Sequence, residues 1–417
     1  MMETSGVHNQ PVVLRPVGLD AIEQELDNLW RDANARIAAT SGHAIARNSV
    51  LTLVVFTQRL ADAEQLMHAL HALTTLHPSR SIFLAAVAQT PGDAIQAAIA
   101  THVGEDSASY GEDILIEAQA GAARHLPGVV LPLIVSGLPS FLWWTGEPPW
   151  HSELFEALVD GSDRLIVDTS EMPRVERSFA ALDDLQRRKG ARSAISDTSW
   201  TAQGPWREIV AQFFDNPEVR PYLEGVERVT IEYAAGDEDA PTNGSQAYLF
   251  AGWLASRLGW RVHQSQGTGV DASRQHTLRD GNGHLVNLEI NARFGIHQQL
   301  WWSPQVGGET LNAGERADLD AAGNPWVRTG ALMSIYIASR LGAKRATFTV
   351  ARESDLAHAT TACQVPDIPT PSQTVHLQSI GEHHHPLAQQ LQMMGHDSVY
   401  DEALGAVAAL LGAHPRR

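Results

Sequence analysis

Hydrophobic residues in the first half of the chain form short runs that glycine and proline separate, with segments of helical spacing between them. Runs of this kind predict buried strands, above all where they are rich in β-branched residues. The runs lie at 48–56, 81–88, 113–118, 129–135, 141–144 and 164–168. Helices are expected at about 20–39, 62–76, 94–100, 152–159 and 175–189. Asp20 and Glu23 have the spacing of a capping box at the start of the first helix. The alternation is typical of an α/β domain whose sheet is parallel or mixed and flanked by helices.

Trp143 and Trp144 are neighbours in the run at 141–144. Because successive side chains of a strand point to opposite faces, the two indoles must lie on opposite sides of the sheet. Burial of each indole stabilises a fold by about 4–6 kcal/mol at most. One of them can enter a single core layer, so the other requires a helix on the far face or another protein.

The second half of the chain has a different pattern, with a helix after Pro205, a strand at 226–235 and a helix at 246–258. Alternating segments on either side of the turn Asp280-Gly281-Asn282-Gly283 predict a β-hairpin. Further strands, largely antiparallel, are expected at 295–302, 346–351, 358–364 and 374–380, and helices at 329–341, 387–394 and 399–411. We therefore expect an N-terminal helical segment at 1–45, an N-terminal α/β domain at 46–170 and a C-terminal α+β domain with a largely antiparallel sheet at 171–417.

Acidic residues outnumber basic residues by 48 to 30, which gives a net charge of -18. This charge repels phosphate backbones and anionic lipids, so we expect no nucleic-acid and no membrane partner. The N-terminal sequence lacks the basic and apolar regions of a secretory signal. Cys363 is the only cysteine, which excludes an internal disulfide and fits a reducing compartment. We therefore expect a cytoplasmic protein, in which the sequon Asn243-Gly244-Ser245 is a turn.

The common catalytic motifs are missing. The sequence contains no GxxxxGK[ST] loop, no HExxH and no GxSxG, and Gly267-Thr268-Gly269 lacks the third glycine of a dinucleotide fingerprint. We therefore predict no catalytic residue, no metal and no cofactor. His383–His385, with His376 and His396 nearby, are the one metal-like group. Three consecutive histidines cannot all face one ion from a regular strand or helix, so we prefer a solvated loop there.

Several charged residues would suit catalysis or anion binding. Asp160, Asp163 and Asp168 could supply acid/base groups or Mg²⁺ ligands, although Asp160 to Asp163 is more simply a turn. Arg80 follows His77-Pro78-Ser79 and could bind an anion at the edge of the sheet. An arginine between a helix and a strand more often pairs with a buried carboxylate, and we favour that interpretation.

Five stretches of the chain carry a family likeness. They are HPSRSI, LPLIVSGLPSFLWWTGEPP, GSDRLIVDTSE, DTSWTAQGPWREIVAQFFD and LFAGWLASRLGW. Together they resemble the OpcA-type glucose-6-phosphate dehydrogenase assembly proteins. The resemblance is strong from Asn48 to Trp260 and weakens beyond, and it says little about the first 45 residues.

The resemblance implies a bacterial, non-catalytic protein that binds glucose-6-phosphate dehydrogenase, favours its active oligomer and raises its apparent substrate affinity. Such an allosteric activator would bear on NADPH supply through the oxidative pentose phosphate pathway. A protein that binds the active conformation more tightly than the inactive one must shift the equilibrium toward activity. A tenfold preference corresponds to about 1.4 kcal/mol.

The residues that we expect to contact the partner or shape its site are Trp143, Trp144, Trp200, Trp206 and Arg207, with His77, Pro78 and Arg80 in support. Tryptophan and arginine are enriched in interface hot spots, although most tryptophans are core residues. The structural alternative for all eight is that they fix the sheet edge and the domain junction, and we favour it for Trp143 and Pro78. Trp206 and Arg207, at the start of a helix, are the preferred contacts.

Two other functions stay open. The chain could be a small-ligand-binding protein, or an enzyme that acts on a phosphorylated metabolite in a cleft between the domains. Asp163 and Asp168 would then be the carboxylates and Arg80 the anion partner. A purely structural scaffold, in contrast, would bind the dehydrogenase without changing its kinetics.

Overall fold

The computed structural model describes residues 14–41, 49–70, 78–87, 90–103, 110–190, 192–235, 242–266, 273–294, 329–353, 358–369, 372–377, 386–393 and 395–412. The chain divides into two compact units, Met1–Leu165 and Ile166–Arg417. None of the helices in the described part of the chain is both long enough and apolar enough to cross a membrane.

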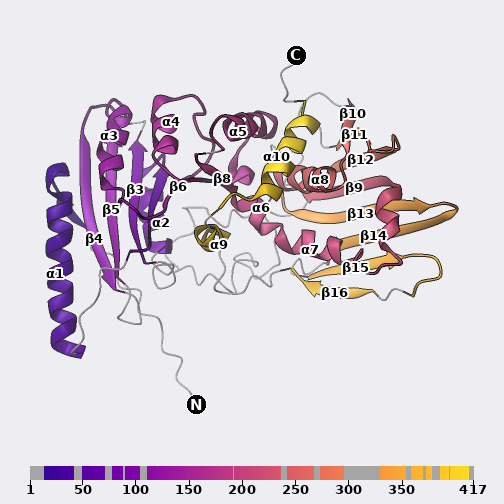
Figure 1. The fold of residues 1–417 in the computed structure, drawn as a ribbon. Helices are drawn as coiled ribbons and strands as arrows, with labels where there is room; N and C mark the ends of the chain where they lie inside the picture. Colours follow the sequence, from indigo (N-terminus) through magenta and orange to yellow (C-terminus); the bar gives the residue numbers. More distant parts are fainter. Residues whose placement is uncertain are drawn as a thin grey trace. The chain divides into compact units, whose positions relative to one another are not determined.

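The first unit contains a sheet with helices packed against it (Figure 1). Its strands are β1 (Arg15–Val17), β2 (Leu51–Thr57), β3 (Ser79–Val87), β4 (Ile95–Val103), β5 (Tyr110–Gln119), β6 (Ser140–Trp144) and β7 (Arg164–Val167), which runs across the division. Its helices are η1 (Leu19–Ala21), α1 (Ile22–Ser41), α2 (Leu60–Leu70), η3 (Ala123–His125), α3 (Leu126–Val130), η4 (Leu131–Leu133) and α4 (Glu153–Asp160).

The first sheet is mixed and has the strand order β1-β4-β5-β3-β2-β6-β7-β8, in which β8 is Ala194–Asp197. β2 pairs in parallel with β3 and β6, and β3 pairs in parallel with β5, whereas β4 and β1 are antiparallel. Every residue of β2 is buried. A central strand covered on both faces requires a continuous apolar run, which is why its position can be predicted from the sequence. The prediction of a mixed α/β sheet is confirmed.

The two adjacent tryptophans of β6 are both covered by this chain. Trp143 is 7% exposed and Trp144 is 1% exposed. Trp144 stacks on Phe56 of β2 with ring centroids 3.7 Å apart, and it meets Phe155 of α4 edge-on at 5.1 Å. Trp143 faces the other side of the sheet, so both faces are covered from within the chain. Neither indole needs another protein for its burial.

Two predictions for the first unit are wrong. The segment at 94–100 is not a helix but part of β4, which pairs with β5 and β1. Its alanines favour a helix locally, and strand pairing overrides that preference. The apolar run at 129–135 lies in α3 and η4 instead of the sheet. Pro127 and Pro132 stand in the first turns of these helices, where a missing N–H loses no hydrogen bond.

The second unit contains the second sheet and its covering helices (Figure 1). The strands of the second sheet are β9 (Val226–Ala234), β10 (Arg261–Gln266), β11 (Ser273–Arg279), β12 (Leu285–Arg293), β13 (Leu332–Leu341), β14 (Lys344–Arg352), β15 (His358–Gln364) and β16 (Gln373–His376), whereas β8 belongs to the first sheet. The helices of the second unit are η5 (Thr169–Glu171), α5 (Val175–Lys189), α6 (Thr198–Ala202), α7 (Gly204–Gln212), η6 (Arg220–Gly225), α8 (Ser245–Arg257), α9 (Pro386–Gln392) and α10 (Ser398–Leu410).

The second sheet has the order β10-β11-β12-β9-β13-β14-β15-β16, and only the pair of β12 and β9 is parallel. The predicted antiparallel character and the hairpin of β11 and β12 are confirmed. The helix predicted at 329–341 is wrong, because this segment contains β13, between β9 and β14. Ile335 and Ile337 are buried there while Ser334 and Tyr336 are partly exposed, which is the two-residue period of a strand. The strand predicted at 295–302 lies outside the described residues.

Candidate functional site

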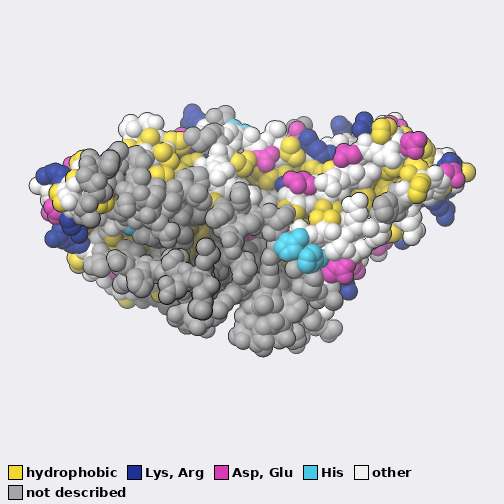
Figure 2. Space-filling model, turned by 90° about the horizontal axis from the view of Figure 1, so that it is seen from below, with side chains coloured by type: hydrophobic (Ala, Val, Ile, Leu, Met, Phe, Trp, Pro, Cys, Tyr) yellow, Lys and Arg dark blue, Asp and Glu magenta, His cyan; other side chains and the backbone are white. Residues whose placement is uncertain are grey.

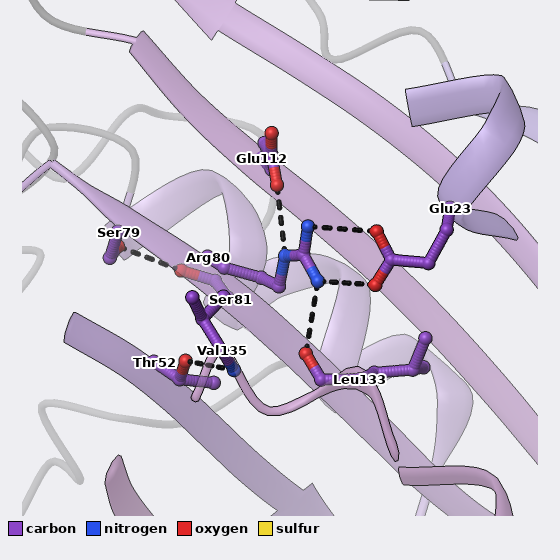
Figure 3. A network of polar contacts seen from close by, with 8 residues as sticks. All are labelled: Glu23, Thr52, Ser79, Arg80, Ser81, Glu112, Leu133 and Val135. Atoms are coloured by element: carbon purple, nitrogen blue, oxygen red, sulfur yellow. Dashed lines mark hydrogen bonds and ion pairs between the residues drawn. The ribbon is translucent and has the colours of Figure 1, made fainter. Parts of the chain in front are cut away.

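Arg80 lies near the start of β3, and two carboxylates hold its guanidinium (Figure 3). Nε donates to Glu112 Oε2 at 2.9 Å, and Nη1 and Nη2 donate to the two oxygens of Glu23 at 2.6 and 3.1 Å. Nη1 also donates to the carbonyl of Leu133 at 3.0 Å. The side chains of Arg80 and Glu112 are 6% and 1% exposed. The capping box predicted with Asp20 is therefore wrong, because Glu23 compensates a buried charge instead.

This cluster is not arranged to bind an anion. Two carboxylates face one guanidinium, so the cluster carries a net negative charge. Arg80 is also at the amino end of the parallel strands, whereas ligands of open α/β sheets bind beyond the carboxyl ends. The favoured interpretation of Arg80, a pair with a buried carboxylate, is confirmed. Pro78 is half-buried and its carbonyl accepts from Val50 N at 2.8 Å, while His77 lies outside the described residues.

Trp200 and Arg207 form one cluster in the second unit. Trp200 of α6 is 4% exposed, and its indole N–H donates to Asp397 Oδ2 at 2.8 Å. Cζ of Arg207 lies 3.6 Å from the centre of the Trp200 ring, and Nη1 donates to the Trp200 carbonyl at 2.7 Å. Burial lowers the pKa of Arg207 to about 10, which leaves it charged at neutral pH. Asp397 also caps the start of α10, so the cluster joins α6, α7 and α10.

The four tryptophans predicted as partner contacts are all core residues of this chain. Trp143, Trp144, Trp200 and Trp206 are between 1% and 7% exposed. Trp206 lies on the buried face of α7, with the guanidinium of Arg352 5.6 Å from its ring. A side chain so deeply buried acts on a partner only through the surface that it supports. A role for these residues in partner binding stays a prediction.

The carboxylates of the enzyme alternative have partners inside the fold. Asp163 Oδ2 accepts from the backbone N–H of Ser140 at 2.8 Å and from its hydroxyl at 2.9 Å. Asp160 is the last residue of α4, and the chain turns at Gly161 as the sequence predicts. Asp168 Oδ1 accepts from the backbone N–H of Ser170 at 3.0 Å, at the start of η5. The contacts of Asp163 join the residue before β7 to the start of β6, and that of Asp168 stabilises the start of η5.

Asp168 forms reciprocal caps with Asp197, an aspartate that no motif in the sequence identified. Asp168-Thr169-Ser170 follows β7, and Asp197-Thr198-Ser199 stands at the end of β8. Asp197 accepts from the backbone of Ser199 at 2.9 Å, and from the backbone and the hydroxyl of Thr169 at 3.1 and 2.6 Å. Asp168 in turn accepts from the Ser199 hydroxyl at 2.7 Å. Each aspartate therefore caps the short helix that follows it and also accepts hydrogen bonds from the other short helix. The repeated Asp-Thr-Ser tripeptide is the signal in the sequence that could have revealed them.

Asn243 fixes the same segment from the other side. Its Nδ2 group donates to the carbonyls of Thr169, Ser170 and Met172 at 3.1, 2.9 and 2.9 Å. Its Oδ1 accepts from the backbone N–H of Ser245, the first residue of α8, at 2.9 Å. The sequon, predicted as a turn, lies at the start of α8, and the amide that glycosylation would modify is engaged in internal hydrogen bonds.

The buried position of Asp197 predicts a pH dependence of stability. Burial, and after it the charge of Asp168, raise the pKa of Asp197 from 3.8 to about 7. Because the folded state holds this proton more tightly than the unfolded chain, stability falls as the pH rises through this interval. We expect the free energy of unfolding of the wild type to fall by about 2–4 kcal/mol relative to that of Asp197→Asn between about pH 4.5 and 7.5. Urea unfolding of both proteins measures this difference, and parallel pH profiles would contradict it.

His276 also affects how stability depends on pH, so the effect of Asp197 must be measured against the Asp197→Asn variant. Burial and then the charge of Arg274 lower the pKa of His276 to about 4. The unfolded chain therefore binds this proton more tightly, and stability rises with pH as the unfolded histidine loses it. This contribution opposes that of Asp197 in the wild type, and it cancels when wild type and Asp197→Asn are subtracted.

Neither a group of metal ligands nor the thiol of Cys363 forms a catalytic site in the described part of the chain. No group of three or more His, Cys, Asp or Glu side chains in the described ranges is placed to hold a metal ion. His383–His385 lie outside the described residues. Cys363 of β15 is half-buried and lies beside a shallow hollow of about 450 Å³, lined by Arg345 and residues in 363–368.

Comparisons of this sequence with known proteins all indicate the same family. Residues 193–404 match the C-terminal domain of the glucose-6-phosphate dehydrogenase subunit family, and residues 70–187 match the N-terminal domain of the same family. A relative from Synechocystis, provisionally named OxPP cycle protein OpcA, is 27% identical over 72% of this chain and 56% of its own length. Its counterpart from Nostoc punctiforme is 33% identical over 40% of this chain and 34% of its own length. The chain thus spans about half the length of these relatives or less.

Solved structures are more distant. The 3-ketoreductase KijD10 from Actinomadura kijaniata aligns over 87% of this chain and 96% of its own, with a TM-score of 0.44 and 11% identity. That similarity is too low to indicate an activity. The two family domains, in contrast, match in sequence order and together cover most of the chain, and the chain therefore belongs to the OpcA family of glucose-6-phosphate dehydrogenase subunits.

Proposed function

We propose that this protein binds glucose-6-phosphate dehydrogenase, favours its active oligomer and raises its apparent affinity for glucose 6-phosphate, without catalysing a reaction itself. The observation that carries the proposal is the match of both halves of the chain to domains of a glucose-6-phosphate dehydrogenase subunit. The relatives' names, which refer to the OxPP cycle, support a role in the oxidative pentose phosphate pathway.

The internal contacts of the charged side chains support a role without catalysis. Arg80 is held by Glu23 and Glu112, and Asp163 accepts from Ser140. Activation by binding needs none of these groups, because differential affinity for the active conformation is sufficient. The net charge of -18 would also attract a partner with a basic surface.

An assay with the dehydrogenase of the same organism tests the proposal. With this protein present, we expect the apparent KM for glucose 6-phosphate to fall severalfold, and the two proteins to co-elute in size exclusion. Binding of the active conformation about tenfold more tightly would supply about 1.4 kcal/mol for this shift. Co-elution with unchanged kinetics would instead indicate a scaffold. Turnover of a sugar phosphate by the purified chain alone would indicate an enzyme.

The exposed side of α7 is the surface that we propose for the contact. This helix buries Trp206, Ile209 and Val210, and it leaves Ala211 and Gln212 exposed. Trp206→Ala would not test docking, because truncation of a buried tryptophan typically lowers stability by about 3–5 kcal/mol. Substitution at an exposed position of the helix separates partner binding from folding.

Ala211→Arg is the variant that tests this surface. We expect at least about tenfold more protein to be needed for half-maximal activation, because a long charged side chain in the middle of a contact prevents close packing. The thermal midpoint should stay nearly constant, since arginine has a high helix propensity. Leu341→Arg, which introduces the same side chain at a 43% exposed position of β13, is the matched control and should activate normally. Normal activation by Ala211→Arg would show that the dehydrogenase binds another surface of this protein.

A further inference from the structure

His358 and His376 form a cross-strand pair at one edge of the second sheet. β16 is the last strand of that sheet, and it pairs antiparallel with β15 so that His376 lies directly opposite His358. Directly opposite residues project to the same face of an antiparallel pair. The ring centroids are 4.7 Å apart, with the ring planes inclined by 73°. Figure 2 shows histidine side chains gathered in one place on the surface, beside an acidic side chain.

The spacing of the two rings is that of two imidazoles on one metal ion. A Zn–N bond is about 2.0–2.1 Å long, and with tetrahedral coordination two imidazole ligands have ring centroids about 5 Å apart. The observed separation of 4.7 Å is close to this value. The two rings therefore lie at the separation that a shared ion requires.

Glu353 adds negative charge next to the pair. Its backbone N–H donates to the carbonyl of His358 at 2.8 Å, so it continues the row of His376 and His358 onto the next strand. Its carboxylate accepts a hydrogen bond from the hydroxyl of Thr360. Thr360 is two residues from His358 along β15 and therefore lies on the same face. A carboxylate beside two imidazoles favours a bound cation.

We propose that His358 and His376 together bind a divalent transition-metal ion of the class that prefers imidazole, which comprises Zn²⁺, Ni²⁺ and Cu²⁺. The two neutral rings supply two ligands, and water or a side chain of another molecule completes the coordination. The site lies on an edge strand, where such a further ligand has access. It is independent of the proposed activation of the dehydrogenase.

Titration of the full chain with Zn²⁺ in a calorimeter tests this site. We expect saturable binding at about pH 7.5, and a loss of at least about tenfold in affinity for His358→Gln and for His376→Gln. Both side chains are at least partly exposed, so the variants should fold, which an unchanged thermal midpoint would verify.

Control variants separate this pair from other histidines. His263→Gln, an exposed position of β10 at the opposite edge of the sheet, should bind Zn²⁺ as the wild type does. A triple substitution of His383–His385 by glutamine tests the consecutive histidines. Loss of affinity in the His358 and His376 variants supports the proposal whatever the triple variant does. Wild-type affinity in either of those two variants, or the absence of saturable binding to the wild type, overturns it.

Discussion

Replacement of Arg80 by alanine is expected to lower the free energy of unfolding by about 3–5 kcal/mol, because it leaves a buried carboxylate without its cation. Glu112 is 1% exposed, and its Oε2 accepts from Nε of Arg80 at 2.9 Å. Arg80 also bonds Glu23 of α1, so the same change weakens the attachment of α1 to the sheet. Urea unfolding of the wild type and Arg80→Ala measures the effect.

Two comparisons show whether the unpaired charge is the cause. The double variant Arg80→Ala/Glu112→Gln should recover part of the lost stability, since a neutral amide is less unfavourable in a buried site than a carboxylate. Arg59→Ala removes an arginine that is 59% exposed and pairs with Asp62, and such surface pairs contribute about 0–1 kcal/mol. If Arg80→Ala unfolded at the same urea concentration as Arg59→Ala, the buried pair would not stabilise the fold as argued.

The strands that could be predicted from the sequence are those whose burial requires an unbroken run of apolar residues. β2 is buried along its whole length, so its run of apolar residues is unbroken. β4 is an antiparallel strand between β1 and β5, and only this pairing distinguishes its alanine-rich segment from a helix. Tertiary pairing is not visible in a local window. For this reason β4 was predicted as a helix.

The candidate site was predicted less well than the fold for a similar reason. The partners of Arg80 are 57 and 32 residues away along the chain, so the sequence indicates a buried carboxylate without identifying Glu23 or Glu112. Aromatic content alone cannot show whether a tryptophan is covered by its own chain. Trp200 illustrates this limit, because the side chain that its indole N–H bonds, Asp397, lies 197 residues away.

Trp144→Ala is the second change with a large expected effect. Trp144 is 1% exposed, stacks on Phe56 at 3.7 Å and contacts Phe155 of α4, so its removal leaves a cavity between the sheet and that helix. We expect a loss of about 3–5 kcal/mol in the free energy of unfolding, measured by urea unfolding. Trp144→Phe should lose less. It keeps a ring against Phe56, and the indole N–H that it removes has no hydrogen-bond partner in the described part of the chain.

The same pair of variants distinguishes the two roles considered for Trp144. If Trp144 were an anchor that a partner covers, alanine there would abolish activation of the dehydrogenase and leave the unfolding midpoint almost unchanged. If it is a core residue, the midpoint falls, and Trp144→Phe retains both fold and activation. Burial from within the chain favours the second outcome, because a partner can gain no contact area from an indole that is already covered. An unchanged midpoint for Trp144→Ala would therefore contradict the packing of β6 against α4.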